Sequence, residues 1–137
     1  MVAYATDGTE PDLSNVIQHF LDKGVTVYLP RFINPSCYEI AKVDNLCLSQ
    51  KKWGIPEPAV EAEVASDEIL RNSLWLVPGV AFDEHGGRLG RGRGIYDRLL
   101  SSGAGTVIGV FYECQKCDSL PMESHDWKMD MIVTEFA

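Results

Sequence analysis

Hydrophobic and polar positions along the chain form blocks that predict strands and helices in alternation. Residues 2–5 are a short apolar run, residues 25–29 predict a buried strand, and residues 74–77 are a continuous apolar run with the length of a buried strand. Residues 106–112 and 131–134 have the same character. Because helical segments separate these strands, the pattern predicts an α/β fold in which helices cover a sheet.

The clearest predicted helix follows the first strand. Apolar side chains recur at positions 13, 16, 17, 20 and 21, which is one face of a helix. Residues 9–12 predict its start, with Thr9 as the cap and Pro11 in the first turn, and Gly24 is expected to end it. Residues 66–72 and 95–101 predict two shorter helices.

The region after residue 29 is less regular. Pro30 is expected to stop the strand before it. Residues 38–43 alternate and predict a less buried strand, with residues 46–48 as a possible partner. Residues 53–58 contain two prolines and predict an ordered surface loop rather than a regular element.

Composition places the chain among ordinary globular proteins. Its 137 residues predict one domain over residues 1–137, with 45% hydrophobic and 23% charged residues and no long apolar stretch. The start has no signal-peptide pattern, so the cytoplasm is the expected compartment. A net charge of -8 argues against nucleic acid and membrane surfaces as partners. The sequence makes no prediction of oligomeric state.

The cysteines do not indicate a metal or redox site. They stand at positions 37, 47, 114 and 117, and only Cys114 and Cys117 have the spacing of a C-x-x-C motif. Ordinary reduced thiols are favoured over metal or redox chemistry, and nothing in the spacing of His85 or His125 requires a ligand role.

A segment rich in glycine and arginine follows the strand at residues 74–77. Glycine stands at 86, 87, 90, 92 and 94, and arginine at 88, 91, 93 and 98. Exposed backbone N–H groups, guanidinium groups and the following helix start would together bind a polyphosphate, at the strand end where open parallel sheets bind ligands. A purely structural turn is the alternative, but the mutual repulsion of the interleaved arginines favours a bound anion.

Three carboxylates are candidates for work at the same site. Asp97 and Asp126 could hold Mg²⁺ together with ligand phosphates, or could respectively complement a helix dipole and cap a turn. Glu10 has a similar ambiguity, since it could serve only the first turn of a helix.

Residues 76–97 resemble the signature of the 5-formyltetrahydrofolate cyclo-ligase family, also called methenyltetrahydrofolate synthetase. Further matches occur in order at residues 10–12, 29–31, 53–58, 115, 125–126 and 130, so the resemblance covers nearly the whole chain. It implies a three-layer α/β fold with a mostly parallel central sheet flanked by helices, similar to the ribose-phosphate isomerase and CoA-transferase-like fold.

The resemblance also implies a reaction and its cofactors. ATP, with Mg²⁺, would phosphorylate the formyl oxygen of 5-formyltetrahydrofolate, and ring closure would then release phosphate and form 5,10-methenyltetrahydrofolate. The expected partners are therefore a folate substrate and ATP, and the resemblance implies a ligase of one-carbon metabolism that binds a nucleotide and a metal ion.

Carried over by position, the resemblance implies roles for individual residues. The ATP site would comprise Arg88, Leu89, Gly90, Arg91, Gly92, Arg93, Gly94, Ile95 and Tyr96, of which Arg91, Arg93 and Tyr96 would be catalytic. The substrate would contact Ala5, Glu10, Trp53, Arg91, Gly92, Arg93, Gly94 and Ile95. Asp97 and Asp126 would hold Mg²⁺. Glu10 would accept pterin N–H groups, and Trp53 would be a stacking wall or, alternatively, a core anchor.

Two departures from the family pattern leave alternatives. Ile95 stands where many members have a tyrosine, and the chain begins at its first strand where members usually have a basic helical segment. The alternative to an active ligase is a shortened, weakly active or inactive paralogue that binds folate or nucleotide. A structural or interaction domain that binds neither is the third hypothesis.

Overall fold

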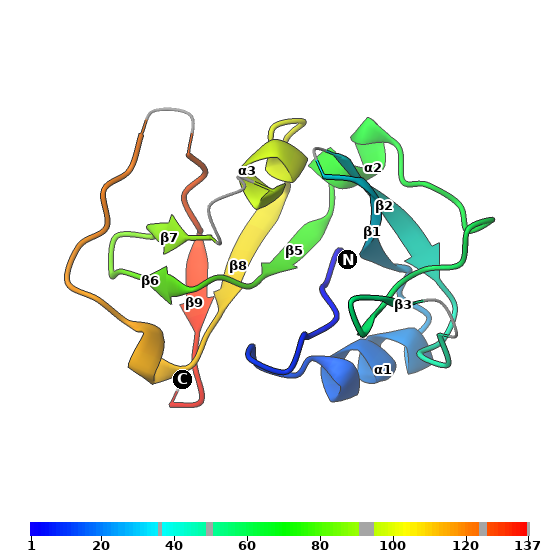
Figure 1. The fold of residues 1–137 in the computed structure, drawn as a ribbon, viewed down its shortest axis with the longest axis horizontal. Helices are drawn as coiled ribbons and strands as arrows, with labels where there is room; N and C mark the ends of the chain where they lie inside the picture. The colour runs from blue at the N-terminus through cyan, green and yellow to red at the C-terminus, as the bar shows by residue number, and fades with distance from the viewer. Residues whose placement is uncertain (36, 49–50, 91–94, 124–125, 137) are drawn as a thin grey trace.

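The structure is a computed structural model that describes residues 1–35, 37–48, 51–90, 95–123 and 126–136. At its centre lie three parallel strands in the order β5 (Leu74–Val77), β8 (Thr106–Val110) and β9 (Met131–Val133) (Figure 1). These strands confirm three of the predicted apolar runs, and with the flanking helices they confirm the α/β class.

The N-terminal residues extend this sheet. Val2 forms parallel bridges both to Tyr28 in β1 (Val27–Asn34) and to Trp75 in β5. Its N–H donates to the Leu74 carbonyl and its carbonyl accepts from Leu76, each at 2.8 Å, while β2 (Cys37–Val43) pairs antiparallel with β1. The first residues therefore join the β1–β2 pair to the three parallel strands.

Apolar side chains pack on both faces of the sheet. On one face, Ile17 of α1 (Ser14–Asp22) packs in a cluster with Leu29 and Leu76. On the other, Leu70 of α2 (Asp67–Arg71) and Leu100 of α3 (Ile95–Leu100) share a cluster with the fully buried Trp75. Successive strand residues face opposite sides of a sheet, so the strands contribute apolar side chains to both clusters. A layer of helix therefore lies on each face, with α1 at the bottom of Figure 1 and α2 and α3 at the top.

The predicted start of the first helix is wrong. α1 begins at Ser14, and its N-cap residue makes no side-chain cap. The carbonyls of Glu10 and Pro11 accept instead from the hydroxyls of Thr6 and Tyr4, at 3.0 and 2.7 Å. Since these contacts hold residues 10 and 11 outside the helix, Thr9 cannot act as its cap. Gly24, with a φ of +81°, ends the helix region as predicted.

Two predictions about the β1–β2 region are also wrong. β1 continues past Pro30, which pairs with Ile40. The Tyr28 N–H donates to the Met1 carbonyl, on the side of β1 away from β2. Strand residues two apart direct their N–H groups to the same side, so the N–H that Pro30 lacks would also face away from β2, and no hydrogen bond to β2 is lost. Residues 63–65, rather than 46–48, lie along the other edge of β2, where the Ala65 N–H donates to the Ile40 carbonyl.

The predicted loop over residues 53–58 contains a small hairpin. β3 (Lys51–Lys52) pairs antiparallel with β4 (Ile55–Pro56). The two-residue turn places Trp53 at a φ of +52° and Gly54 at +77°, and a tight hairpin favours positive φ at both central positions. The prolines therefore did not prevent pairing, and the turn leaves the Trp53 side chain 63% exposed.

A second hairpin lies between β5 and α3. β6 (Ala81–Phe82) pairs with β7 (Arg88–Leu89), and the turn between them is organised by the buried carboxylate of Asp83. That carboxylate accepts from the N–H groups of His85, Gly87 and Leu120 at 2.8–2.9 Å. A Cβ on Gly87 would lie 2.6 Å from an Asp83 oxygen, so the turn requires glycine at this position.

The remaining predicted elements are confirmed within a residue or two. Ser66 caps α2 by accepting the Ile69 N–H at 3.2 Å. β8 ends at Val110, before a short 3-10 helix η1 (Glu113–Gln115). No helix in the described ranges is long and apolar enough to cross a membrane.

Replacing Asp83 with asparagine should lower the free energy of unfolding at neutral pH by about 1–3 kcal/mol. Burial disfavours the charge, but the N–H groups of Leu120, Gly87 and His85 outweigh it and hold the pKa of Asp83 below its usual value. The carboxylate therefore stabilises the fold above the unfolded-state pKa of about 3.9, and this contribution is lost as the pH falls through the lower folded-state pKa. Urea denaturation at neutral and acidic pH measures the difference between wild type and D83N.

The exposed Asp118 provides the control, since its replacement by asparagine should cost little at any pH. A loss for D83N that stays constant down to strongly acidic pH would contradict the role given to the ionised carboxylate.

Candidate functional site

Residues that carry the polar groups of the candidate site follow the ends of the parallel strands. Tyr4 follows the N-terminal strand segment, Pro78 follows β5, and Tyr112 lies just beyond β8. Because these segments run parallel, their carboxyl ends meet at one edge of the sheet, which is where open α/β sheets bind ligands.

Arg88 is the central cation of this edge. Its side chain is 6% exposed, its Nη1 donates to the Pro78 carbonyl at 3.0 Å, and its Nη2 lies 4.0 Å from Oδ1 of Asp97. The guanidinium carbon lies 5.3 Å from the centre of the Tyr96 ring. Burial lowers the pKa of Arg88, and the charges of Asp97 and Asp126 act in the opposite direction. Asp97 therefore lies near this guanidinium group, and the charge of Asp126 acts on the same group.

The two carboxylates reach this position from separate segments. Asp97 stands in the first turn of α3, and its Oδ1 lies 3.4 Å from the Trp127 N–H nitrogen. Asp126 accepts the Glu123 N–H at 2.9 Å. The described residues contain no group of three or more His, Cys, Asp or Glu that could enclose a metal ion. An ion here would therefore take further oxygen ligands from a bound phosphate or from water, as Mg²⁺ commonly does.

Glu10 lies beside two tyrosines of the same edge. Burial raises the pKa of Tyr4 and of Tyr96, and the negative charge of Glu10 raises both further. The Tyr4 hydroxyl donates to the Pro11 carbonyl, which holds the loop that carries Glu10. The structure thus brings Glu10 to Tyr96, although 85 residues separate them in the chain.

Trp53 belongs to an aromatic group next to this edge. Its ring meets Phe32 edge-on at 4.9 Å, and Phe32 meets Tyr38 in the same way at 5.5 Å. Tyr38 in turn affects the pKa of Tyr96 electrostatically, so the group adjoins the charged cluster. Since Trp53 is 63% exposed, the alternative that it anchors the core is wrong.

The other predicted contact residues are more scattered. Ala5 is partly buried and packs against the core on the α1 side. Ile95 lines a small cavity of about 190 Å³ with Cys37, Tyr38, Arg98 and Leu99. Leu89 is about half exposed on β7, and the Arg88 guanidinium lies against the backbone of Gly90.

The glycine- and arginine-rich segment divides into two parts. Gly86, with a φ of +84°, and Gly87 serve the β6–β7 turn, so the structural alternative holds for these two glycines. Arg91, Gly92, Arg93 and Gly94, which carry most of the predicted phosphate contacts, lie outside the described residues, as does His125. All four cysteines are free thiols.

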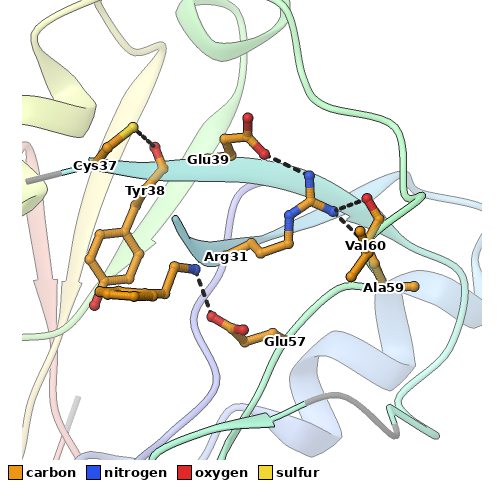
Figure 2. A network of polar contacts seen from close by, with 8 residues as sticks. Arg31, Cys37, Tyr38, Glu39, Glu57, Ala59 and Val60 are labelled. Atoms are coloured by element: carbon orange, nitrogen blue, oxygen red, sulfur yellow. Dashed lines mark hydrogen bonds and ion pairs between the residues drawn. The ribbon is translucent and has the colours of Figure 1, made fainter. Parts of the chain in front are cut away.

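A polar network beside the aromatic group had no role in the sequence prediction. Figure 2 shows Arg31 between Glu39 and the carbonyls of Ala59 and Val60, with its ion pair to Glu39 at 2.6 Å. The buried Glu57 carboxylate accepts the Phe32 N–H at 2.6 Å. Charged residues flanked by prolines in residues 30–31 and 56–58 were the available sequence signal. This network holds the segment after Trp53 against β1.

A larger hollow of about 490 Å³ lies elsewhere, between the β6–β7 turn and β9. Its lining includes His85, Lys116 and Met131, and Gly86 from the turn of the glycine- and arginine-rich segment, but none of the residues to which the family resemblance gives a site role. The convergence of charges at the strand ends, rather than the size of a hollow, therefore defines the candidate site.

The sequence model of the 5-formyltetrahydrofolate cyclo-ligase family matches residues 1–135. The chain belongs to this family. Since relatives are named as 5-formyltetrahydrofolate cyclo-ligases, it is a member of an enzyme family, and the resemblance seen in residues 76–97 is confirmed.

Individual relatives agree with this assignment. The 5-formyltetrahydrofolate cyclo-ligase of Mycolicibacterium smegmatis is 33% identical over 139 residues, which cover 96% of this chain and 71% of that protein. A probable 5-formyltetrahydrofolate cyclo-ligase of Schizosaccharomyces pombe is 32% identical over 127 residues, which cover 82% of this chain and 62% of that protein. The chain thus spans less than two thirds of that relative.

A solved structure shares the fold. The 5,10-methenyltetrahydrofolate synthetase of Aquifex aeolicus superposes with a TM-score of 0.81 at 36% identity, covering 99% of this chain and 68% of that one. The candidate site therefore lies in a fold that this chain shares with a methenyltetrahydrofolate synthetase.

Two tyrosines of this cyclo-ligase family member, Tyr4 and Tyr96, should ionise late in an alkaline titration. Of its five tyrosines, Tyr4 and Tyr96 have pKa values raised above the usual value of about 10. Replacing either with phenylalanine should remove tyrosinate absorbance only from the most alkaline part of the curve. The measurement is an ultraviolet titration of wild type and both variants, with circular dichroism to confirm that the chain remains folded. Loss of amplitude near the usual pKa would contradict the burial of that tyrosine beside Glu10.

Proposed function

We propose that the chain converts 5-formyltetrahydrofolate to 5,10-methenyltetrahydrofolate, using ATP and Mg²⁺ and releasing ADP and phosphate. The observation that supports this most directly is the convergence of Arg88, Asp97 and Asp126 beside Tyr96 in a member of the cyclo-ligase family. A cation and two carboxylates at a sheet edge suit a reaction that handles phosphoryl groups.

The chemistry requires positioning more than a protein nucleophile. The formyl oxygen attacks the terminal phosphorus of ATP, a new O–P bond forms, and ADP leaves with the electrons of the broken bond. The N10 nitrogen of the folate then attacks the activated formyl carbon and loses its proton to solvent, and the former formyl oxygen departs with its bonding electrons as part of inorganic phosphate. Because both steps depend on alignment and on stabilising negative charge, the protein need supply only orientation and cations.

The described residues suit the metal and nucleotide part of this reaction. Asp97 and Asp126 would hold Mg²⁺, which when bound neutralises phosphate charge, and Arg88 would orient Asp97 from the other side. Tyr96 packs against that guanidinium and would fix its direction. Residues 88–96 would line the ATP phosphates, with Arg91 and Arg93 as the charge-stabilising residues.

The remaining residues suit the folate. The Glu10 carboxylate would accept two pterin N–H groups, since paired donors match a carboxylate. Trp53 and Phe32 would form an aromatic wall for the substrate, and Ala5 with residues 91–95 would complete the contacts. We also propose that the parallel sheet follows the ribose-phosphate isomerase and CoA-transferase-like arrangement.

Replacing Asp97 with asparagine should lower kcat by at least a hundredfold, because one of the two carboxylates that would hold Mg²⁺ is lost. The assay follows the near-ultraviolet absorbance of the methenyl product with ATP, Mg²⁺ and 5-formyltetrahydrofolate present. Asp67, also acidic and in the first turn of a helix, is the matched control, and D67N should retain activity. Equal effects of D97N and D67N would mean that Asp97 only complements its helix dipole.

The same assay tests the proposed function as a whole. An absence of product with the wild-type chain would contradict the ligase. Thermal stabilisation by ATP or folate without turnover would then indicate the alternative, a binding protein of the same family.

Replacing Glu10 with glutamine should raise the KM for 5-formyltetrahydrofolate about tenfold, because the amide keeps one acceptor but loses the charge. The KM for ATP should not change, since Glu10 is assigned to the folate. E61Q, at an exposed position, is the control and should leave both values at the wild-type level. A parallel rise in both KM values for E10Q would show that Glu10 supports the site only structurally.

A further inference from the structure

We propose that Lys52 and the aromatic group beneath it form the binding site for a carboxylate of the substrate's glutamyl tail. The proposal rests on the proposed function and extends it to a part of the substrate for which no residue has been assigned. It starts from the position of the Lys52 ammonium, which lies 4.5 Å from the centre of the Phe32 ring and 4.9 Å from the centre of the Trp53 ring.

The hairpin holds Lys52 in this position. Lys52 pairs with Ile55 across β3 and β4, and the positive φ angles of Trp53 and Gly54 close the turn directly after it. The Lys52 side chain is partly buried, whereas its neighbour Lys51 is exposed. Successive strand residues point to opposite sides, so the two lysines differ in environment although they are adjacent in the chain.

The ammonium has no acidic partner among the residues that the structure describes. Other basic side chains here do: Arg31 pairs with Glu39, and Arg88 lies near Asp97. The nearby Glu57 carboxylate already accepts the Phe32 N–H. Lys52 is therefore a cation in place on an aromatic surface, with ammonium donors available to an anion, in a chain whose net charge is -8.

The covalent structure of the substrate matches this juxtaposition of a cation and aromatic rings. In a folate, the p-aminobenzoyl ring is joined through an amide to glutamate, so an aromatic ring and carboxylates lie next to each other in one ligand. A ring packed on Phe32 and Trp53 would bring the first glutamate to the Lys52 ammonium. The aromatic contact and the ion pair can coexist, because the ammonium has three donors.

The test removes the charge on the protein and the glutamate on the substrate separately. Lys52→Met keeps the alkyl stem, Lys52→Arg keeps the charge, and Lys51→Met is the matched control. KM and dissociation constants are measured for 5-formyltetrahydrofolate and for 5-formyltetrahydropteroate, which lacks the glutamate. Binding is followed by calorimetry without ATP, and turnover by the absorbance of the product.

We expect K52M to weaken binding of the glutamate-bearing compound about tenfold to hundredfold and to leave binding of the pteroate compound unchanged. K52R should stay within about threefold of wild type, and K51M should match wild type for both compounds. The KM for ATP should not change in any variant.

A K52M variant that loses affinity equally for both compounds, or for neither, would overturn the proposal. Turnover and binding are measured separately, so a wild-type chain that binds folate without forming product would contradict the ligase and still decide the role of Lys52. A wild-type chain that binds neither compound would overturn both.

Discussion

The structure depends on the insertion of its first three residues as a strand between β1 and β5. Backbone groups of Met1, Val2 and Ala3 bond to both neighbouring strands, and the side chains of Val2 and Ala3 are fully buried on opposite faces. Each such hydrogen bond contributes about 0.5–1.5 kcal/mol net to stability. Together these bonds also join two separate groups of strands into one sheet. Tyr4 and the loop with Glu10 reach the carboxyl edge because this strand runs parallel to β5.

A second constraint is the burial of a positive charge at that edge. The Arg88 guanidinium is buried, and its partners are the Pro78 carbonyl and Asp97. Without such partners, burying this charge would cost several kcal/mol. The Asp83 turn fixes the hairpin, and the hairpin fixes where Arg88 enters the site. The same contacts that satisfy the buried charge therefore place Asp97 beside it.

The aromatic side of the site is built by different means. Trp53 is exposed, and its position follows from a tight turn and from the polar network of Arg31 and Glu57 rather than from burial. An exposed ring with a fixed orientation can serve as a contact surface, since little conformational entropy remains to be lost on binding. The two sides of the site are thus positioned independently and adjoin where Tyr38 and Ile95 line one cavity.

Sequence patterns by themselves determined the central strands, the amphipathic character of α1, the position of α2 and the family, because each depends on residues close together in the chain or on a long continuous motif. The extent of β1, the start of α1 and the partner of β2 depended on tertiary contacts. Pro30 could continue a strand because its missing donor faces away from β2, and Pro11 stayed outside a helix because Tyr4 bonds its carbonyl. The approach of Glu10 to Tyr96, and of Lys52 to Phe32, was also decided only by the fold. Local propensity acts over a few residues, whereas these groups meet only after distant strands have been brought into one sheet.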